Sequence, residues 1–122
     1  MKNGALGSRA VYYYKCGYSC SRCIIKAAEE KYGISAADTH RALNGINNGL
    51  GIGIICSIPI ACIMVLGLMY DDESVVKRKR LELLMQFKDE FKAFNCCEIQ
   101  KNIPDCEQVI KKGCDILENL IE

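Results

Sequence analysis

Apolar residues recur at helical spacing along most of the chain, and serine, asparagine or glycine marks the ends of the runs. A short helix is expected over residues 8–15. Ser19 is expected to cap a helix that ends at Gly33, because glycine readily adopts the left-handed conformation of a helix terminus. Ser35 is expected to cap a second helix that runs toward Gly45. Nowhere do apolar and polar residues alternate as in a half-buried strand.

A long stretch without charged residues follows, beginning in a loop of asparagines and glycines at residues 47–53. The run from 50 to 69 is long enough to cross a bilayer. Glycines, Ser57 and Pro59 interrupt its first part, however, and basic residues flank it on both sides. We therefore expect a helix buried in a protein core over residues 61–68, with Ser57 as its N-cap, and keep a membrane span as the less favoured alternative.

Two further helices are expected in the second half of the chain. Asp72 and Ser74 lie in a polar break that caps a long amphipathic helix, and residues 95–101 link it to a last helix that opens near Pro104. Gly113 lies on the apolar face of that helix and indicates a close crossing with a neighbour. The pattern predicts an all-α, single-domain bundle of about five helices over residues 1–122, with a central buried helix and a loosely packed segment at residues 1–15.

Length and charge narrow the classes of function. A chain of 122 residues suits one compact domain. Its 16 basic and 15 acidic residues leave a formal net charge of +1, which gives no field that favours nucleic acid, so no nucleic-acid partner is expected. The first 15 residues contain no apolar region typical of a secretory signal, so we expect a reducing cytoplasm and no membrane partner.

Cysteine is the unusual part of the composition. Nine cysteines cannot all pair within one chain, and in the cytoplasm clustered cysteines more often serve redox or metal chemistry than structural bridging. Cys56 is expected just before a helix N-terminus and Cys106 in the first turn of the last helix. Cys20 is expected near the start of its own helix, with Arg22 and Lys26 close by. The partial positive charge of a helix N-terminus and nearby cations favour a reactive thiolate.

A metal site is an alternative use of the same sulfurs. Cys16, Cys20 and Cys23 form C-x3-C-x2-C, the spacing of the [4Fe–4S] ligands in radical S-adenosylmethionine enzymes. Those enzymes resemble a partial α/β barrel, which this chain cannot build, so that class is discarded while an iron–sulfur or zinc site is kept. The single histidine, His40, is expected on the surface. Core packing is the simpler expectation for the cysteines on apolar helical faces, namely Cys23, Cys62 and Cys114.

The order of the cysteines, the glycine loop and the helix after it resemble the C-GCAxxG-C-C family of redox-active proteins, over nearly the whole chain from Tyr18. GYSCS at 17–21 is similar to the first cysteine segment, and residues 49–53 are similar to the glycine loop. IMVLGL at 63–68 is similar to the segment after the central motif. FNC at 94–96, with Glu98 and Ile99, resembles the third cysteine segment, and Cys106 with ILE at 116–118 resembles the fourth. The resemblance implies a functional quartet of Cys20, Cys56, Cys96 and Cys106.

The central motif departs from the family pattern. It reads CSIPIA at 56–61, with Ser57, Ile58 and Ala61 where the family has glycine, alanine and glycine. If the glycines allow a backbone or cofactor to approach the sulfur, Ser57 and Ala61 narrow that space.

The leading hypothesis is that the quartet cycles between dithiol and disulfide, with Cys56 as an attacking thiolate of depressed pKa and Cys20 as its partner. The alternative is that the same cysteines hold zinc or an iron–sulfur cluster. A third reading is a structural or membrane-associated protein whose cysteines merely pack. A redox partner of unknown identity is implied, and the long apolar run makes a homodimer an expectation.

Overall fold

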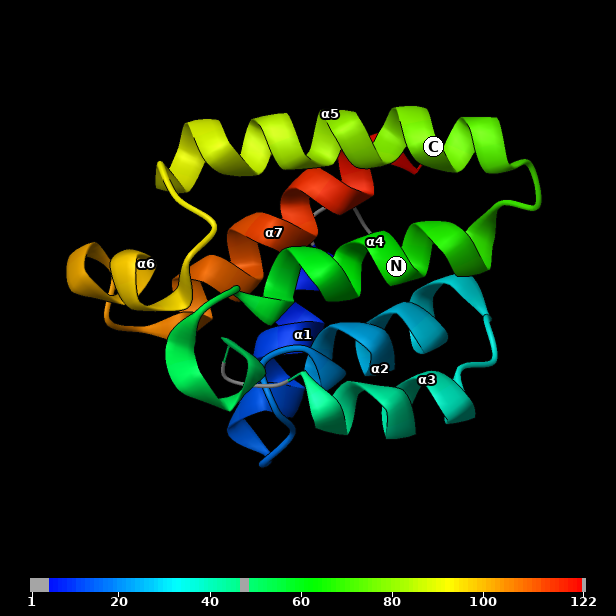
Figure 1. Ribbon diagram of the computed structural model, residues 1–122. Helices are drawn as coiled ribbons and strands as arrows, with labels where there is room; N and C mark the ends of the chain where they lie inside the picture. Colours follow the sequence, from blue (N-terminus) through cyan, green and yellow to red (C-terminus); the bar gives the residue numbers. More distant parts are fainter. Residues whose placement is uncertain (1–4, 47–48, 122) are drawn as a thin grey trace.

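We describe residues 5–46 and 49–121 of a computed structural model of the chain (Figure 1). They form the α-helices α1 (Ala5–Lys15), α2 (Arg22–Tyr32), α3 (Ala37–Ala42), α4 (Ser57–Met69), α5 (Glu73–Phe91), α6 (Cys96–Asn102) and α7 (Cys106–Leu120). A 3₁₀ turn, η1 (Leu43–Gly45), and a π-helical turn, η2 (Gly49–Gly53), lie between α3 and α4. The described residues contain no strand, which confirms the all-α prediction. Asn47 and Asn48 of the expected loop lie outside the described residues.

The number of helices is higher than the expected five. The described residues form seven α-helices: six correspond to the helical segments of the sequence pattern, and the seventh, α6, lies in the link expected at residues 95–101. Asn95 caps α6 by accepting hydrogen bonds from the backbone N–H groups of Cys97, at 2.9 Å, and Glu98, at 3.3 Å. At seven residues, α6 is too short to show a repeating apolar pattern in the sequence.

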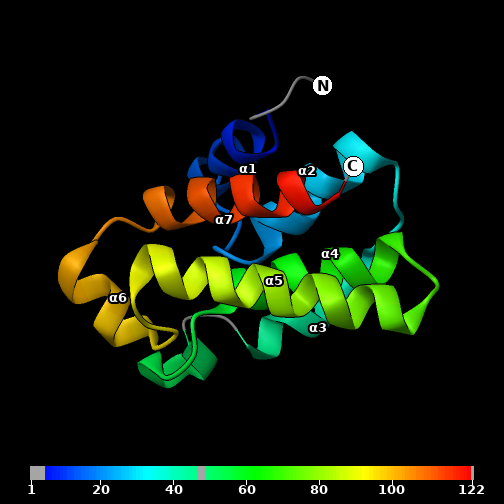
Figure 2. The same cartoon turned by 90° about the horizontal axis from the view of Figure 1, so that it is seen from above.

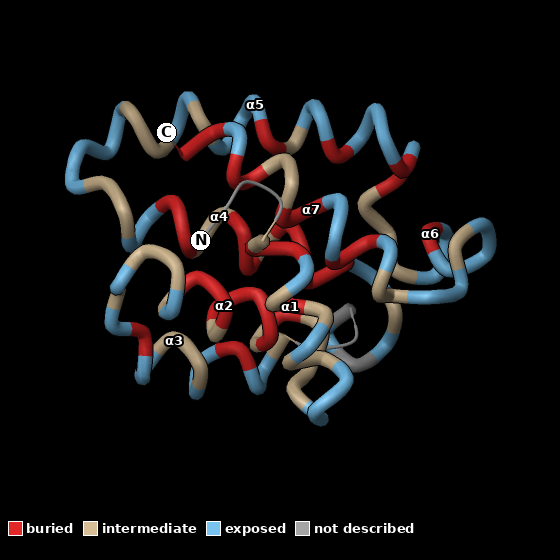
Figure 3. Tube along the Cα trace, turned by 180° about the vertical axis from the view of Figure 1, so that it is seen from behind, coloured by how far each residue is buried: buried red, intermediate tan, exposed pale blue. Residues whose placement is uncertain are grey.

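The helix α4 lies in the middle of the bundle. It packs against α2, α5 and α7. On one side of α4 and α7 lies α5, and on the other side lie α1 and α2 (Figures 1 and 2). Buried residues line the first half of α4, whereas Gly67 and Leu68 near its end are exposed (Figure 3). The expected central helix is therefore present, but it is not covered along its whole length.

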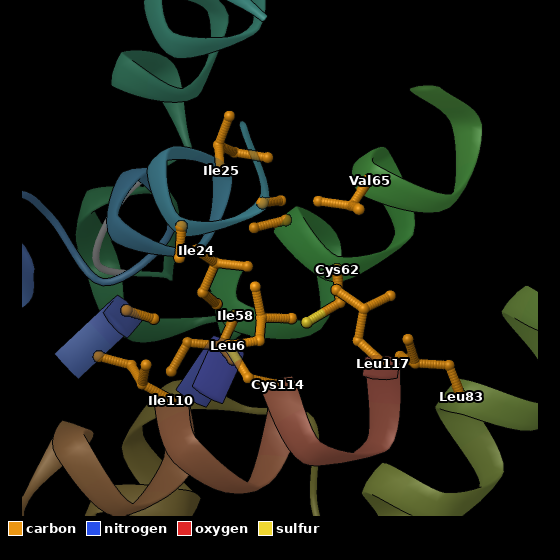
Figure 4. Packing of buried hydrophobic residues seen from close by; sticks show 14 of the residues in the cluster. Leu6, Ile24, Ile25, Ile58, Cys62, Val65, Leu83, Ile110, Cys114 and Leu117 are labelled. Atoms are coloured by element: carbon orange, nitrogen blue, oxygen red, sulfur yellow. The ribbon is translucent and has the colours of Figure 1, made fainter. Parts of the chain in front are cut away.

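Side chains from four helices meet in the core. Leu6 of α1, Ile24 of α2, Ile58 of α4 and Leu117 of α7 are all at most 1 % exposed (Figure 4). Gly113 lies where α7 crosses α4, and a Cβ atom at this position would lie 3.0 Å from a methyl group of Ile58. The close crossing predicted from this glycine is confirmed.

The first helix is more tightly packed than expected. Residues 1–15 were predicted to be loosely packed, but α1 packs against α2 and α7, and Leu6 and Ala10 are fully buried. A Cβ atom at Gly7 would lie 3.2 Å from the backbone carbonyl oxygen of Lys111. Small residues on α1 thus allow its backbone to approach α7, which the sequence pattern of this short segment did not reveal.

Three of the expected N-caps, Ser19, Ser35 and Ser57, are wrong. Ser57 is the first residue of α4, and Cys56 takes the N-cap position instead. Ala36 rather than Ser35 precedes α3, with no side-chain cap. Helix α2 begins at Arg22, although Ser19 still accepts a hydrogen bond from the Arg22 N–H at 3.3 Å. The ends predicted at Gly33 and Asp72 are confirmed: Gly33 has φ +68° and the Asp72 carboxylate accepts from the Ser74 N–H.

The length and hydropathy of the helices test the alternative that residues 50–69 span a membrane. Among the residues described, no helix combines the length and the apolar character needed to cross a bilayer.

Candidate functional site

Four cysteines lie at the N-termini of four different helices. Cys56 is the N-cap of α4, Cys96 is the first residue of α6 and Cys106 is the first residue of α7. Cys20 lies in the turn just before α2. The starts of α4, α6 and α7 lie at the same end of the bundle (Figure 1). We call Cys20, Cys56, Cys96 and Cys106 the quartet.

Short contacts connect the segments that carry these cysteines. The Cys20 Sγ lies 3.3 Å from the Ser57 Oγ, so the turn before α2 touches the start of α4. The Cys56 N–H donates to the Phe94 carbonyl oxygen at 2.8 Å, and the Cys96 N–H donates to the Ile54 carbonyl oxygen at 3.3 Å. This pair of backbone hydrogen bonds fixes the chain before α4 beside the chain before α6.

Electrostatic effects reach across all four cysteines. Burial raises the pKa of the Cys56 thiol to about 12, and negative charge on Cys20, Cys96 or Cys106 would raise it further. Burial is also the main cause of the raised pKa of Cys96, and negative charge on Cys106 or Cys20 would raise it further. The fold thus brings together the four cysteines that the resemblance implied.

The expectation of a depressed pKa at Cys56 is wrong. The Ile58 N–H near the start of α4 does lower this pKa, as expected at a helix N-terminus. The side chain is only 5 % exposed, however, and the loss of hydration disfavours the thiolate more strongly. Cys56 is therefore a poor attacking thiolate at neutral pH.

Cys106 lies among polar side chains. The Gln100 Nε2 donates to its Sγ at 3.9 Å, a long contact that the size of sulfur permits. Burial raises the pKa of Tyr14 in α1, and the nearby Cys106 raises it further. Neither Tyr14 nor Gln100 was singled out from the sequence as part of a site. Tyr14 is far from Cys106 along the chain, and Gln100 lies in the segment that was expected to be a link.

The altered central motif fills space beside the quartet. Ser57, which stands where the family has glycine, is 1 % exposed and places its hydroxyl against the Cys20 thiol. Ala61 is fully buried on the same helix. Ser57 therefore fills space next to the Cys20 thiol.

A glycine of η2 allows another cysteine to come close. Gly53 has φ +74°, and a Cβ atom there would lie 2.4 Å from the Cys97 Sγ. Both the conformation and the lack of space require glycine at this position. Cys97 is exposed and lies next to Cys96 in α6.

The residues predicted as a metal half-site do not fit a metal. Cys16 is exposed after α1, whereas Cys23 is fully buried and its thiol donates to the Cys20 carbonyl oxygen at 3.3 Å. Within residues 5–46 and 49–121, no group of three or more His, Cys, Asp or Glu side chains is arranged to hold a metal ion. The iron–sulfur and zinc alternatives gain no support from Cys16, Cys20 and Cys23 or from the quartet.

The remaining predictions for single residues have mixed outcomes. His40 was expected on the surface, but its side chain is 13 % exposed and its Nε2 lies 2.8 Å from the Glu29 Oε1. Core packing is confirmed for the three cysteines assigned to apolar faces, since Cys23, Cys62 and Cys114 are fully buried. The Cys62 thiol points to α7 and contacts the Gly113 carbonyl oxygen at 3.7 Å (Figure 4).

The comparison with protein families defines the class to which this arrangement belongs. The family described as "Putative redox-active protein (C_GCAxxG_C_C)" matches residues 18–120. The chain therefore belongs to the C-GCAxxG-C-C family, as its sequence indicated. Helix α1 precedes the matched residues. None of the curated proteins and none of the solved structures matches this chain.

Proposed function

We propose that the quartet is a redox centre that cycles between dithiol and disulfide. The observation that carries the proposal is that Cys56 and Cys96 begin two helices whose preceding segments are joined by backbone hydrogen bonds, while the Cys20 thiol contacts Ser57 beside Cys56. Cys106 begins α7 and influences the pKa of both Cys56 and Cys96. Membership of a family described as redox-active supports the same chemistry. All nine cysteines are unpaired in this structure.

The proposed reaction is exchange with a disulfide of a redox partner. A thiolate of the quartet attacks one partner sulfur, which forms a mixed disulfide and releases a partner thiolate that takes up a proton. A second quartet cysteine loses its proton and attacks the mixed disulfide, which releases the other partner thiolate as an internal disulfide closes. Two electrons pass from the quartet to the partner, and two protons follow them.

Burial divides the quartet into two kinds of thiol. Cys20, Cys96 and Cys106 are partly exposed and can meet a partner, whereas Cys56 is buried. With a pKa of about 12, Cys56 stays protonated at neutral pH. It therefore suits the role of an internal thiol that reacts after a disulfide has formed at the surface.

The proposal predicts a specific loss of thiols under oxidation. Reduced protein equilibrated in glutathione buffers of stepped potential should lose two thiols, and peptide mapping without reduction should find a disulfide between two quartet cysteines. The variant Cys16→Ser is the matched control, because Cys16 is exposed and lies outside the quartet. The proposal fails if no quartet disulfide forms at any potential, or if the disulfides found join other cysteines.

We also propose that the protein works in a reducing cytoplasm and as a homodimer. Leu81 and Met85, one turn apart on α5, are each 60 % exposed, and they line a shallow groove with Leu84 and Phe94. Lys88 and Asp89 line the same groove. A second copy related by a two-fold axis would bring apolar side chains together and could pair these opposite charges.

A further inference from the structure

The chain just before α4 buries little of its apolar surface. It consists of η2 and the two residues that follow, and we call residues 49–55 the η2 segment. Four of its side chains are large and apolar, and each is between 41 and 71 % exposed: Leu50, Ile52, Ile54 and Ile55. A segment with few buried apolar contacts detaches at a lower free energy than the whole domain needs to unfold. We therefore expect the η2 segment to open while the helices stay folded.

The first two residues of α6 hold this segment in place. The Cys96 N–H donates to the Ile54 carbonyl oxygen at 3.3 Å, and the Cys97 Sγ lies against Gly53. A Cβ atom at Gly53 would lie only 2.4 Å from that sulfur, so the contact admits no residue larger than glycine. The η2 segment and α6 lie side by side in both views of the bundle (Figures 1 and 2).

The backbone of the η2 segment is also strained. Leu50 has φ +66°, a left-handed conformation that is unfavourable for any residue with a Cβ atom. A π-helical turn is itself uncommon and often lies at a functional site. Strain at Leu50 is released when the segment detaches, so it lowers the free energy of opening.

Cys56 follows the η2 segment directly. Its N–H donates to the Phe94 carbonyl oxygen at 2.8 Å, next to the hydrogen bond between Cys96 and Ile54. Its side chain is only 5 % exposed, although Ile54 and Ile55 just before it are exposed. The burial of this thiol thus adjoins a segment that is itself weakly held.

We propose that the η2 segment is a gate over Cys56. In the closed form Gly53 lies against Cys97 and the Cys56 thiol is shielded. In the open form the segment has left α6, and Cys56 is within reach of other thiols and disulfides. The role of the gate rests on the proposed function, because the gate decides when the internal thiol of the quartet takes part in exchange. The bonds made and broken are those already given for that exchange.

The first test compares Cys56 with a cysteine that only global unfolding exposes. Cys62 is fully buried on the same helix. Fully reduced protein is treated with iodoacetamide at one pH in low concentrations of urea, and each cysteine is followed by mass spectrometry. A local opening exposes little surface, so the Cys56 rate should change little with urea, whereas the Cys62 rate should rise steeply. An equal urea dependence at the two cysteines would overturn the gate.

Two glycine variants separate the gate from a general loss of stability. Gly53→Ala places a Cβ against the Cys97 sulfur and strains the backbone, so it should speed modification of Cys56 by roughly five- to thirtyfold. Gly33→Ala is the matched control, because Gly33 has φ +68° at the end of α2 and an added Cβ there would have open space. It imposes the same kind of backbone strain away from the gate, so Cys56 should keep its wild-type rate. If both variants speed Cys56 alike, the gate is wrong.

A further variant tests the contact between Gly53 and Cys97. In Cys97→Ala protein the sulfur is absent, so Gly53→Ala adds only backbone strain. Gly53→Ala should therefore speed Cys56 less in Cys97→Ala protein than in wild type. The same effect in both backgrounds would show that this contact does not hold the gate closed.

Oxidation separates failure of the gate from failure of the proposed function. In glutathione buffer, Gly53→Ala should form disulfides that include Cys56 faster than wild type does. If quartet disulfides form but Cys56 becomes reactive only with global unfolding, the redox centre stands and the gate is wrong. If Gly53→Ala speeds alkylation of Cys56 but neither protein forms a quartet disulfide, the gate is present and the proposed function is wrong.

Discussion

Cys56 takes the N-cap position of α4, where the unpaired N–H groups of the first turn favour a thiolate. The sequence places it there correctly to within one residue. The sequence does not reveal how much of the side chain water can reach. Because the Cys56 side chain is almost fully buried, loss of hydration dominates and the pKa rises to about 12. Local position along a helix is readable from sequence, whereas burial depends on segments that are distant along the chain.

We predict that Cys56 resists alkylation in the folded protein at neutral pH. Because only the thiolate reacts, its modification rate should keep rising by about tenfold per pH unit through the alkaline range, and should not level off near the usual thiol value of about 8.5. The exposed Cys16 serves as the internal reference, and both cysteines should react alike in denaturant. A Cys56 that reacts as fast as Cys16 at neutral pH in folded protein would contradict the burial.

The raised pKa of Cys56 also makes the stability of the folded protein depend on pH. Folding raises the pKa of Cys56, so the folded state is favoured below the pKa of the unfolded thiol. That contribution to stability is lost as the pH rises above the unfolded value. The buried Cys62, whose pKa is raised to about 12 for the same reason, acts in the same direction.

At the scale of helices, the sequence predicts an element well where a single residue has a strong conformational preference, and poorly where no such residue is present. The end of α2 at Gly33 and the start of α5 at Asp72 follow from single residues with strong conformational or capping preferences. Helix α6 was missed because it is short and depends on its Asn95 cap. The tight packing of α1 was also missed, because its buried surface consists mainly of small residues that give little apolar periodicity.

We predict that α1 contributes to the stability of the whole bundle. Leu6 is fully buried between α1 and its neighbours, so Leu6→Ala should lower the free energy of unfolding by about 2 to 5 kcal/mol, measured by urea denaturation. The matched change Leu68→Ala, at a side chain that is 39 % exposed, should cost clearly less. Equal losses in the two variants would show that α1 is not packed as described.

At the scale of the molecule, the convergence of the quartet could not be derived from spacing. Cys20, Cys56, Cys96 and Cys106 are separated by whole helices, and the packing of α4 against α2 and α7 helps to bring their segments together. The family resemblance named the four residues, but the contacts that connect them, such as that between Cys20 and Ser57, required the structure. The C-x3-C-x2-C spacing suggested a local metal site, yet the α-helical turn directs Cys23 into the core.

Association through α5 is the property of the whole molecule that can be tested directly. If two copies pair through the groove at Leu81 and Met85, sedimentation equilibrium should give twice the chain mass over a range of concentrations. Met85→Lys should convert the dimer to monomer, because it places a charged, strongly hydrated side chain among the apolar side chains of the interface. The control Arg41→Ala changes an exposed residue of α3, outside this groove, and should leave the dimer intact. Wild-type protein that sediments as a monomer throughout would refute the dimer and leave the quartet chemistry unaffected, since no quartet cysteine lines this groove.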